Sequence, residues 1–267
     1  MKIEEVTIAE HAEFAGGYRL LVFEAPAIAG AVGPGQFVHL RVPRFEIGVL
    51  RRPFSVFRAE EGRLSVLYKA VGGGTRAMTR LRVGERLSLM GPLGNGFPRP
   101  ATGGRPVLVA GGYGVAPLSF LARTWPDGGL VFIGGATRTD ILCEKDFDPQ
   151  LWDVRVATDD GSQGVKGLVT VALDAWVASR AAGDPQPEIF ACGPEGMLKA
   201  VGERAVAQGW KAWLSLDKRM GCAVGACLAC VQRVREQDGT ERWTRVCKEG
   251  PVFEAREIVW DGACAGP

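Results

Sequence analysis

Histidine is scarce in this sequence, which holds only His11 and His39 among its 267 residues, in separate segments. Two isolated imidazole groups argue strongly against a metal site built on histidine, a Rieske-type cluster or a Ser-His-Asp triad. We therefore expect each histidine to have a structural role.

The sequence also lacks an excess of charge and a long apolar run. Its 32 Lys and Arg residues balance 30 Asp and Glu residues, a formal net charge of +2, so there is no electrostatic case for binding nucleic acid or an anionic membrane. No apolar run approaches the ~20 residues that a bilayer span needs. Charged and aliphatic residues alternate over residues 1–8, unlike a signal peptide. We predict a soluble, cytoplasmic protein with no nucleic-acid or membrane partner.

Four of the seven cysteines form a pattern near the end of the chain. Cys222, Cys227, Cys230 and Cys247 follow the order C-x4-C-x2-C with a distant fourth cysteine, which is typical of a plant-type [2Fe–2S] ligand set. Small residues between them, such as Gly225, allow tight turns that direct N–H groups at sulfur. Structural zinc, which usually takes two C-x2-4-C pairs, and unligated thiols are the alternatives.

The other three cysteines, Cys143, Cys192 and Cys264, are expected to be free thiols, because an odd remainder in a cytoplasmic chain argues against a disulfide scaffold. Apolar content of 46% with 23% charged residues is ordinary for a globular protein. The length is enough for two compact domains and a small appendage.

The first hundred residues have the pattern of β structure. Short alternating runs separated by Gly, Pro and Glu turns predict a small antiparallel barrel. The predicted strands are residues 18–23, 37–42, 53–57, 64–68 and 86–90. One short helix is predicted over residues 75–81, with Thr75 as its N-cap.

After a Pro- and Gly-rich linker, residues 91–104, the pattern changes to strands that alternate with helices. This alternation predicts a parallel α/β sheet. The predicted strands are residues 106–110, 130–133, 154–157, 188–192 and 211–216, and the helices are residues 117–121, 169–179 and 195–208. We predict a multidomain β and α/β chain in which residues 1–100 form the barrel, 101–215 the Rossmann-like α/β domain and 216–267 a small cysteine-loop domain.

Two motifs in the β half have the chemistry of a phosphate or flavin site. In residues 51–55, Arg-Arg-Pro-Phe-Ser, an arginine on a strand and a hydroxyl can make charge-assisted bonds. After Leu-Tyr-Lys at residues 67–69, the glycines of residues 72–74 and Thr75 place backbone N–H groups at a helix start, which suits a diphosphate. A solvated arginine and a flexible turn are the alternatives, because Gly-rich runs are weak evidence alone.

Three segments of the α/β half end predicted strands. Residues 111–114, Gly-Gly-Tyr-Gly, lie where glycine lets a backbone approach a pyrophosphate, although the full G-x-G-x-x-G is absent. Cys192 lies at a strand's carboxyl end, where it faces a nicotinamide or is a small buried thiol. Residues 158–162, Thr-Asp-Asp-Gly-Ser, are either a ribose contact or an Asx-capped turn.

The order of these motifs is similar to that of the ferredoxin-reductase superfamily. With the cysteine loop added, residues 3–260 resemble the electron-transfer subunits of NAD-dependent dihydroorotate dehydrogenases, the dihydroorotate dehydrogenase B family. The resemblance implies FAD, a [2Fe–2S] cluster and NAD(H) as co-substrate. The residues it implies for FAD are Arg52, Pro53, Phe54, Ser55, Leu67, Tyr68, Lys69, Gly74 and Thr75. Those for the nicotinamide nucleotide are Gly111, Gly112, Gly114 and Cys192, and the cluster ligands are Cys222, Cys227, Cys230 and Cys247.

The resemblance further implies a heterotetramer of two such subunits and two FMN-containing catalytic subunits that oxidise dihydroorotate to orotate in pyrimidine biosynthesis. Electrons would pass between that FMN, the cluster, FAD and NAD(H). No dihydroorotate site and no catalytic residue are expected in this chain. One departure from the family pattern is Asp217, where Glu is more usual.

Two other functions remain open. The first is the FAD and [2Fe–2S] subunit of a related ferredoxin-NAD(P) transhydrogenase, hydrogenase or sulfur reductase. Arg138, after a predicted strand, could then bind a 2′-phosphate or be solvated. The second is a four-cysteine zinc module joined to a nucleotide-sensing Rossmann-like domain.

Overall fold

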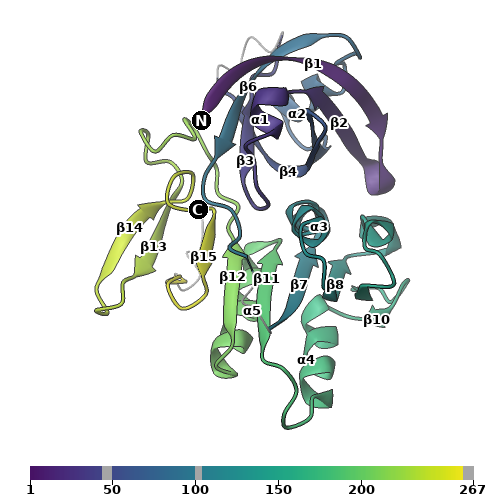
Figure 1. Cartoon of the computed structure of the whole chain (residues 1–267), viewed down its shortest axis with the longest axis vertical. Coiled ribbons are helices and arrows are strands. Elements are labelled where there is room, and N and C mark those ends of the chain that lie inside the picture. The colour runs from purple at the N-terminus through teal and green to yellow at the C-terminus, as the bar shows by residue number, and fades with distance from the viewer. Residues whose placement is uncertain (44–49, 100–103, 261–267) are drawn as a thin grey trace.

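A closed antiparallel barrel forms the first part of the chain (Figure 1). This computed structural model describes residues 1–43, 50–99 and 104–260, and in these residues six strands close the barrel in the order β1-β2-β5-β4-β3-β6. The elements are β1 (Lys2–Glu13), β2 (Tyr18–Glu24), α1 (Pro26–Ala29), β3 (Phe37–Leu40), β4 (Arg52–Glu60), β5 (Arg63–Lys69), α2 (Gly73–Met78) and β6 (Arg86–Leu93).

Alternation along the strands fills the barrel. Leu21 and Phe23 of β2 and Leu64 and Val66 of β5 point inward and are fully buried, as expected for strands with one face in a core. Strand β1, which the sequence analysis did not predict, follows from the same alternation of charged and aliphatic residues that excluded a signal peptide.

Helix α2 begins earlier than predicted. Its N-cap is Gly72, and Thr75 lies three residues further on, where its hydroxyl accepts hydrogen bonds from the backbone N–H groups of Val71 at 3.0 Å and Gly72 at 2.9 Å. The prediction that Thr75 is the N-cap was therefore wrong, because its hydroxyl serves the cap from within the first turn.

The second sheet has the parallel α/β character that the sequence predicted. In the described residues its seven strands run in the order β10-β9-β8-β7-β11-β12-β15. They are β7 (Arg105–Gly111), β8 (Gly129–Gly135), β9 (Trp152–Thr158), β10 (Val165–Lys166), β11 (Pro187–Cys192), β12 (Lys211–Ser215) and β15 (Val252–Glu254). The helices are α3 (Val115–Arg123), α4 (Val169–Ser179) and α5 (Glu195–Ala207).

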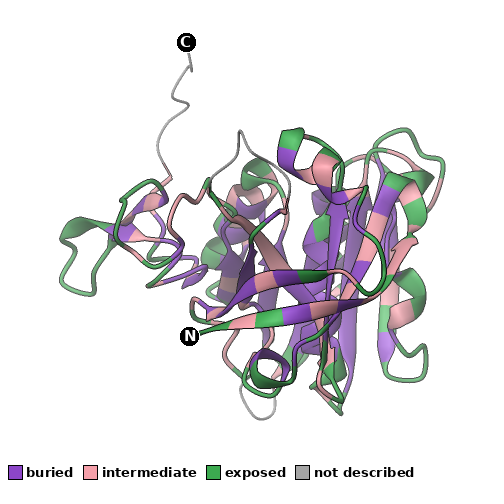
Figure 2. Ribbon diagram, turned by 90° about the horizontal axis from the view of Figure 1, so that it is seen from above, coloured by how far each residue is buried: buried purple, intermediate pink, exposed green. Residues whose placement is uncertain are grey.

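One boundary differs from the prediction: strand β6 continues to Leu93 and so includes the start of the predicted linker. Strand β12 is the last strand before the cysteine loop, and β15 from the cysteine-loop segment pairs with it antiparallel. The rest of that segment forms a hairpin of β13 (Val231–Arg235) and β14 (Glu241–Arg245). Its tip is exposed, whereas buried residues run along the strands of the barrel and the sheet (Figure 2).

The barrel and the α/β sheet share their apolar cores. Helix α3 lies between them and packs against β4, so that Phe57 and Leu67 of the barrel join a cluster with Leu118 of α3. Helices α4 and α5 pack in a different cluster, which also contains Phe37 of the barrel and Leu214 of the sheet. Burial of these apolar side chains, which contributes ~25 cal/mol per Å² of apolar surface removed from water, holds the barrel and the sheet together.

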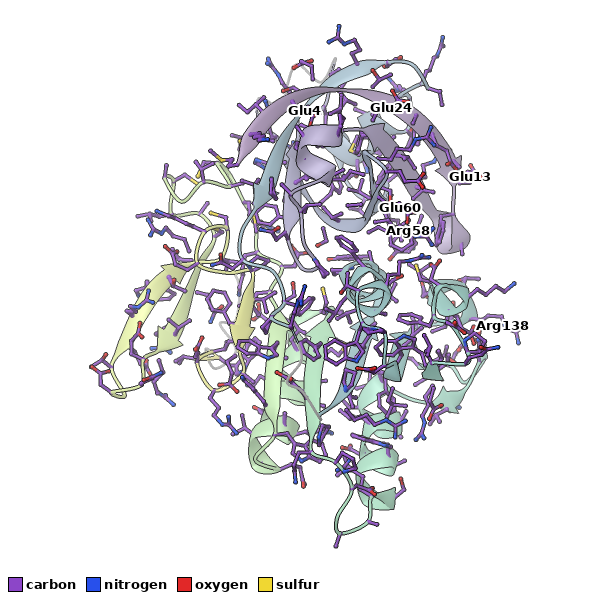
Figure 3. The ribbon with its side chains drawn as sticks, in the orientation of Figure 1. Glu4, Glu13, Glu24, Arg58, Glu60 and Arg138 are labelled. Atoms are coloured by element: carbon purple, nitrogen blue, oxygen red, sulfur yellow. The ribbon has the colours of Figure 1, made fainter. Side chains whose placement is uncertain are left out.

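An ionic contact reinforces this junction. Arg58 of β4 lies at the edge of the barrel that faces the sheet (Figure 3) and pairs with Asp146, which also lies 3.5 Å from Arg123. Among the residues that the structure describes, none of the helices has the length and apolar character that a bilayer span requires.

The order of the strands places a crevice beside β7. The chain passes from β7 through β8 and β9 to one side of the sheet and then returns to β11 on the other side. In sheets of this kind, ligands bind outside the carboxyl ends of the two strands where the order reverses. Here those ends carry Gly111 of β7 and Cys192 of β11.

Gly114→Ala is expected to lower the free energy of unfolding by ~1–3 kcal/mol, because a methyl group at Gly114 would overlap the carbonyl oxygen of Cys192. Thermal unfolding of the purified protein should show a lower midpoint. Gly196→Ala is the matched control, since apart from its chain neighbours and the backbone of its own helix no atom lies within 4 Å of the position its methyl group would take. An unchanged midpoint for Gly114→Ala would contradict the close packing of the two turns.

Candidate functional site

A cleft lies where the barrel, the α/β sheet and the cysteine-loop segment meet. It encloses about 680 Å³ of empty space, part of it open to solvent. Its lining comes from all three parts of the chain: Phe37, Pro53, Phe54, Ser55 and Leu67 from the barrel, Tyr113, Ala116, Cys192, Gly193, Ser215 and Leu216 from the α/β part, and Asp217, Met220 and Pro251 from the segment that follows.

The structure brings four of the nine residues expected to hold FAD into this cleft. Pro53, Phe54 and Ser55 of β4 and Leu67 of β5 line one wall. This wall is mainly apolar with one hydroxyl, which suits a flat aromatic ring with a polar edge.

Arg52 and Gly74 lie together beside the cleft rather than in its lining. A methyl group at Gly74 would lie 2.9 Å from Nε of Arg52, so the missing side chain lets the guanidinium lie against the start of α2. The structure therefore combines a cation with the backbone N–H groups of a helix start, an arrangement that suits phosphate oxygens.

Tyr68 and Lys69 point elsewhere. The Tyr68 ring is buried and packs edge-on to Phe54, with ring centroids 6.2 Å apart. Its hydroxyl lies 2.8 Å from Nε2 of His11, whose Nδ1 lies 2.9 Å from the carbonyl oxygen of Leu81. Since that carbonyl can only accept, Nδ1 carries the proton and the Tyr68 hydroxyl donates to Nε2. Tyr68 thus supports Phe54 from within the barrel.

The Lys69 ammonium group lies over the ring of Tyr18, 5.0 Å from its centroid, and 3.9 Å from Asp140 of the α/β part. This places the end of β5 against the loop that follows β8. Tyr18 also approaches Gly112, where an added methyl group would lie 3.8 Å from its hydroxyl.

The glycines of the Gly-Gly-Tyr-Gly turn serve close packing within the protein. A methyl group at Gly111 would lie 2.7 Å from Sδ of Met197 and 2.8 Å from Cδ of Pro194, and one at Gly114 would overlap the Cys192 carbonyl. The turn after β7 therefore lies directly against the turn after β11. Gly112 has φ of +53°, in the left-handed region that favours glycine.

Cys192 lies at the carboxyl end of β11 and lines the cleft. Burial raises the pKa of its thiol to about 12, so the thiol remains protonated near neutral pH. It offers the cleft a small, neutral and polarisable surface rather than a nucleophile.

The loops that follow β8 and β9 are bound to each other. The Ser162 hydroxyl accepts a hydrogen bond from the backbone N–H of Arg138 at 2.8 Å, and the Arg138 guanidinium donates to the Ser162 carbonyl at 3.1 Å. The backbone N–H of Ser162 donates to Asp160 Oδ1 at 2.9 Å. The Asx-capped turn, one of the two alternatives for residues 158–162, is therefore present.

The cysteine loop brings its thiols together as two pairs. Sγ of Cys227 accepts a hydrogen bond from the backbone N–H of Cys222 at 3.4 Å. Sγ of Cys230 accepts one from the backbone N–H of Cys247, also at 3.4 Å. No group of three or more Cys, His, Asp or Glu side chains surrounds a single metal position within residues 1–43, 50–99 and 104–260. The arrangement as two cysteine pairs suits a cluster of two irons, with one pair for each iron.

Backbone N–H groups surround Cys222. Val224, Ala226 and Cys227 donate to its Sγ at 3.4, 3.2 and 3.4 Å. Burial acts to raise the pKa of this thiol, but these donors outweigh it and lower the pKa to about 6. The loop that brings these N–H groups around the sulfur has left-handed backbone at Ala223, Gly225 and Leu228. An N–H cage of this kind stabilises a thiolate, the form that binds iron.

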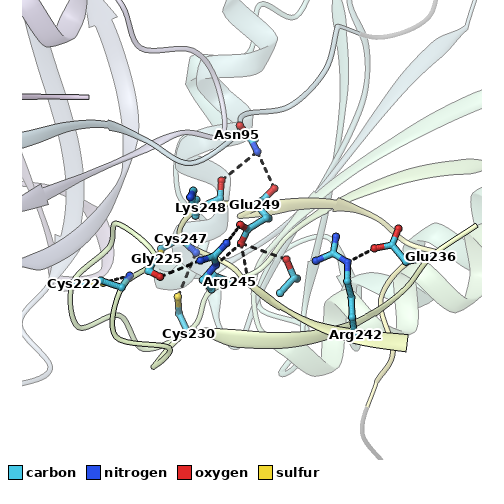
Figure 4. Close-up of polar contacts among 12 residues, drawn as sticks. Asn95, Cys222, Gly225, Cys230, Glu236, Arg242, Arg245, Cys247, Lys248 and Glu249 are labelled. Carbon is cyan, nitrogen blue, oxygen red and sulfur yellow. Dashed lines mark hydrogen bonds and ion pairs between the residues drawn. The ribbon is translucent and has the colours of Figure 1, made fainter. Parts of the chain in front are cut away.

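A polar network behind the loop was missed by the sequence analysis (Figure 4). Arg245 donates to the carbonyl of Gly225 at 3.3 Å and to Glu249 at 3.0 Å. Asn95, which follows the barrel, donates to the carbonyl of Glu249 at 2.9 Å. This network joins both halves of the cysteine loop to the barrel. The spacing of Arg245 and Glu249, i and i+4, is a signal that could have revealed the ion pair.

Tyr113, also missed, lines the cleft beside Cys192. Its hydroxyl donates a hydrogen bond to Oδ2 of Asp217 at 2.8 Å. The sequence analysis noted Asp217 only as a departure from a pattern, and no sequence signal links residues so far apart in the chain.

Comparisons with known proteins show which proteins the chain is similar to. A family model of the iron-sulfur cluster binding domain of dihydroorotate dehydrogenase B matches residues 217–259. The chain is 38% identical over 264 residues to the electron transfer subunit of dihydroorotate dehydrogenase B (NAD(+)) from Geobacillus thermodenitrificans, covering 96% of this chain and 98% of that protein. The subunit of the same name from Shouchella clausii is 38% identical over 261 residues, covering 95% and 97%.

Solved structures show the same architecture. A NADH-dependent reduced ferredoxin-NADP oxidoreductase aligns with a TM-score of 0.83 at 28% identity, covering 97% of this chain and 91% of that chain. The ferredoxin reductase of carbazole 1,9a-dioxygenase, at 23% identity and a TM-score of 0.66, covers 78% of this chain and 66% of that chain and shares the fold.

Cys227→Ser is expected to remove iron and acid-labile sulfide from the purified protein, because it takes one thiol from a pair. Chemical analysis of iron and sulfide per chain measures this. Cys143→Ser is the control, since Cys143 is buried in the α/β core away from the loop and should retain both. Full iron and sulfide in Cys227→Ser, or zinc in place of iron in the unaltered protein, would contradict the ligand assignment.

Proposed function

The chain belongs to the family of electron transfer subunits of dihydroorotate dehydrogenase B (NAD(+)), and on this premise we propose which of its residues bind each cofactor. It is an oxidoreductase subunit that transfers electrons with FAD, a [2Fe–2S] cluster and NAD(H). The observation that carries the assignment of residues is the single cleft onto which the barrel, the switch-point crevice and the cysteine-loop segment all open. The proposed parts are residues 1–100 for FAD, 101–215 for the nucleotide and 216–267 for the cluster.

The residues around the barrel wall fit FAD. Pro53, Phe54 and Leu67 offer an apolar wall to a flavin ring, and Ser55 offers a hydroxyl to its polar edge. The Arg52 guanidinium, which lies against Gly74, offers a positive charge to the diphosphate, and the start of α2 offers backbone N–H groups. The remaining proposed residues act from behind or beside this wall: Tyr68 supports Phe54, Lys69 lies toward the α/β part, and the Thr75 hydroxyl holds the backbone N–H of Gly72, the N-cap of α2.

The crevice between β7 and β11 fits the nicotinamide nucleotide. Gly111 and Gly114 let the two turns lie close together, and Gly112 supplies the left-handed backbone of the first turn. The neutral thiol of Cys192 lies at the cleft. The nicotinamide would thereby lie at the same cleft as the flavin wall. When bound, FAD links the two-electron chemistry of NAD(H) to the one-electron chemistry of the cluster.

The cysteine pairs fit a [2Fe–2S] cluster, since four thiolates supply two irons with two ligands each. The N–H groups around Cys222 direct hydrogen bonds at its sulfur, and Arg245, which is paired with Glu249, holds the Gly225 carbonyl of the same loop. Hydrogen bonds of this kind hold an anionic cluster and adjust its potential.

The partner in this proposal is the FMN-containing catalytic subunit that oxidises dihydroorotate, in a heterotetramer of two of each chain. Apolar side chains are exposed beside the cysteine loop: Leu228 and Trp243 are each 61% exposed and line an open groove with Val231 and Arg242. Exposed apolar residues around a site that must exchange electrons suit a docking surface. A cytoplasmic location remains a prediction from the sequence.

The functional test uses the native complex, isolated with whatever chain accompanies this one. NAD-linked oxidation of dihydroorotate should be present and should be lost in Cys227→Ser, while bleaching of the flavin absorbance by NADH survives, because Cys227 is not among the residues that line the cleft. Full dihydroorotate activity in Cys227→Ser would show that the assigned path is wrong. If flavin bleaching occurs without dihydroorotate activity, the partner is that of a ferredoxin-NAD(P) transhydrogenase or a related enzyme.

Trp243→Glu is expected to weaken assembly with the catalytic subunit by roughly 2 kcal/mol, about 30-fold in dissociation constant, because it replaces an exposed apolar side chain beside the cysteine loop by a charge. Binding of the purified catalytic subunit to the immobilised chain measures this. Val206→Glu on α5, which is also exposed, is the control and should bind normally. Equal binding of the catalytic subunit by both variants would show that the docking surface lies elsewhere on the chain.

A further inference from the structure

Tyr113 lies across the crevice in which the nicotinamide nucleotide is proposed to bind. It belongs to the turn between β7 and α3, and 51% of its surface is exposed. Its hydroxyl donates to Oδ2 of Asp217 at 2.8 Å. Asp217 follows β12 on the other side of β11, so this hydrogen bond spans the carboxyl edge of the sheet at the switch point.

Two cavities meet at this hydrogen bond. The first is the cleft at the flavin wall. The second encloses about 370 Å³ of empty space at the start of α5, where Pro194, Glu195 and Lys218 line it. Both cavities share four lining residues, Tyr113, Gly193, Leu216 and Asp217. Tyr113 and Asp217 therefore form the partition between the flavin side and the α5 side of the crevice.

A dinucleotide is too long to occupy the flavin side alone. Its nicotinamide ring must reach the wall of Pro53 and Phe54, while the rest of the molecule continues along the carboxyl edge of the sheet. The route along this edge passes the partition, because Gly193 and Leu216 border both cavities. Productive binding thus requires the Tyr113 side chain to leave Asp217.

The hydroxyl of Tyr113 can act only as the donor in this contact. Burial, followed by the negative charge of Asp217, raises the pKa of Tyr113 above its usual value, so the phenol remains neutral at working pH. Asp217 is exposed and can be solvated when the contact opens, which keeps the opening cost moderate.

A second contact ties the same stretch to the crevice. Lys218 pairs with Glu195 at the start of α5 at 2.7 Å. The consecutive residues Asp217 and Lys218 therefore bind the turn after β7 and the turn after β11, which flank the switch point. The stretch that leads to Met220 and Cys222 is thereby attached to the nucleotide side of the molecule.

We propose that the Tyr113–Asp217 hydrogen bond is a latch that closes the nicotinamide site and opens when the dinucleotide enters. This inference rests on the proposed function, since it assumes that NAD(H) binds in the crevice. Tyr113 and Asp217 are positioning residues: they determine how readily the ring reaches the flavin wall and take no part in the transfer itself. Opening joins the two cavities into one site.

The test measures equilibrium binding of NAD⁺ by calorimetry to the FAD-loaded complex. Tyr113→Phe keeps the ring and removes the donor, so NAD⁺ should bind roughly 3- to 10-fold more tightly, the effect of an ordinary hydrogen bond, because Tyr113 is half exposed and Asp217 is exposed. KM for NADH should fall by a similar factor, while the rate of flavin reduction at saturating NADH changes little.

Asp217→Ala removes the acceptor and should also tighten binding. Because each change breaks the same bond, the double variant should bind no more tightly than Asp217→Ala alone. Asp174→Ala, which removes a negative charge paired with Arg204 on the surface of α4, is the control for charge and should bind NAD⁺ as the unaltered protein does.

Unchanged or weaker NAD⁺ binding by Tyr113→Phe would overturn the latch, as would additive effects in the double variant. If the unaltered complex itself fails to bind NAD⁺, the proposed function fails as well. NAD⁺ binding by the unaltered complex therefore distinguishes failure of the latch from failure of the proposed function.

Discussion

The close approach of two turns at the switch point of the α/β sheet determines where the rest of the site can lie. Gly111 and Gly114 have no side chains, so the turn after β7 lies directly against Met197, Pro194 and the Cys192 carbonyl at the turn after β11. Helix α3 follows the first of these turns and packs on β4, which carries the flavin wall. The two proposed cofactor sites therefore face one cleft, because the turn that packs against β11 leads directly into the helix that packs on the barrel.

The cysteine loop is held to this frame by three separate connections. Strand β15 joins the sheet beside β12, Asn95 binds the backbone at Lys248 and Glu249, and Arg245 binds Glu249 and Gly225. A loop rich in small residues would otherwise have considerable conformational freedom. Electron transfer needs cofactors at constant separation, and these connections provide that constancy without enclosing the exposed Cys227. The surface left open beside it carries Leu228 and Trp243.

Sequence reasoning predicted most of the fold because its signals are local. Alternation of apolar and polar residues predicted five of the barrel strands, and continuous apolar runs predicted the parallel strands. Strand β1 was missed although it alternates, because charged residues occupy its outer face. Strand β15 is only three residues long and belongs to the sheet through pairing with β12, far away in the sequence. Thr75 was taken as the cap because residue type alone does not distinguish the N-cap from the third position of a capping box.

For the site, the sequence by itself determined the chemistry. The spacing of Cys222, Cys227, Cys230 and Cys247, the Arg-Pro-Phe-Ser run and the glycine turns indicate which groups are available. Only the tertiary structure decided which of them meet: it placed Pro53, Phe54, Ser55, Leu67 and Cys192 in one cleft and turned Tyr68 into the barrel. It also paired Tyr113 with Asp217, 104 positions apart. The physical reason is that spacing records local geometry, whereas a contact between distant side chains depends on how the sheets and helices pack.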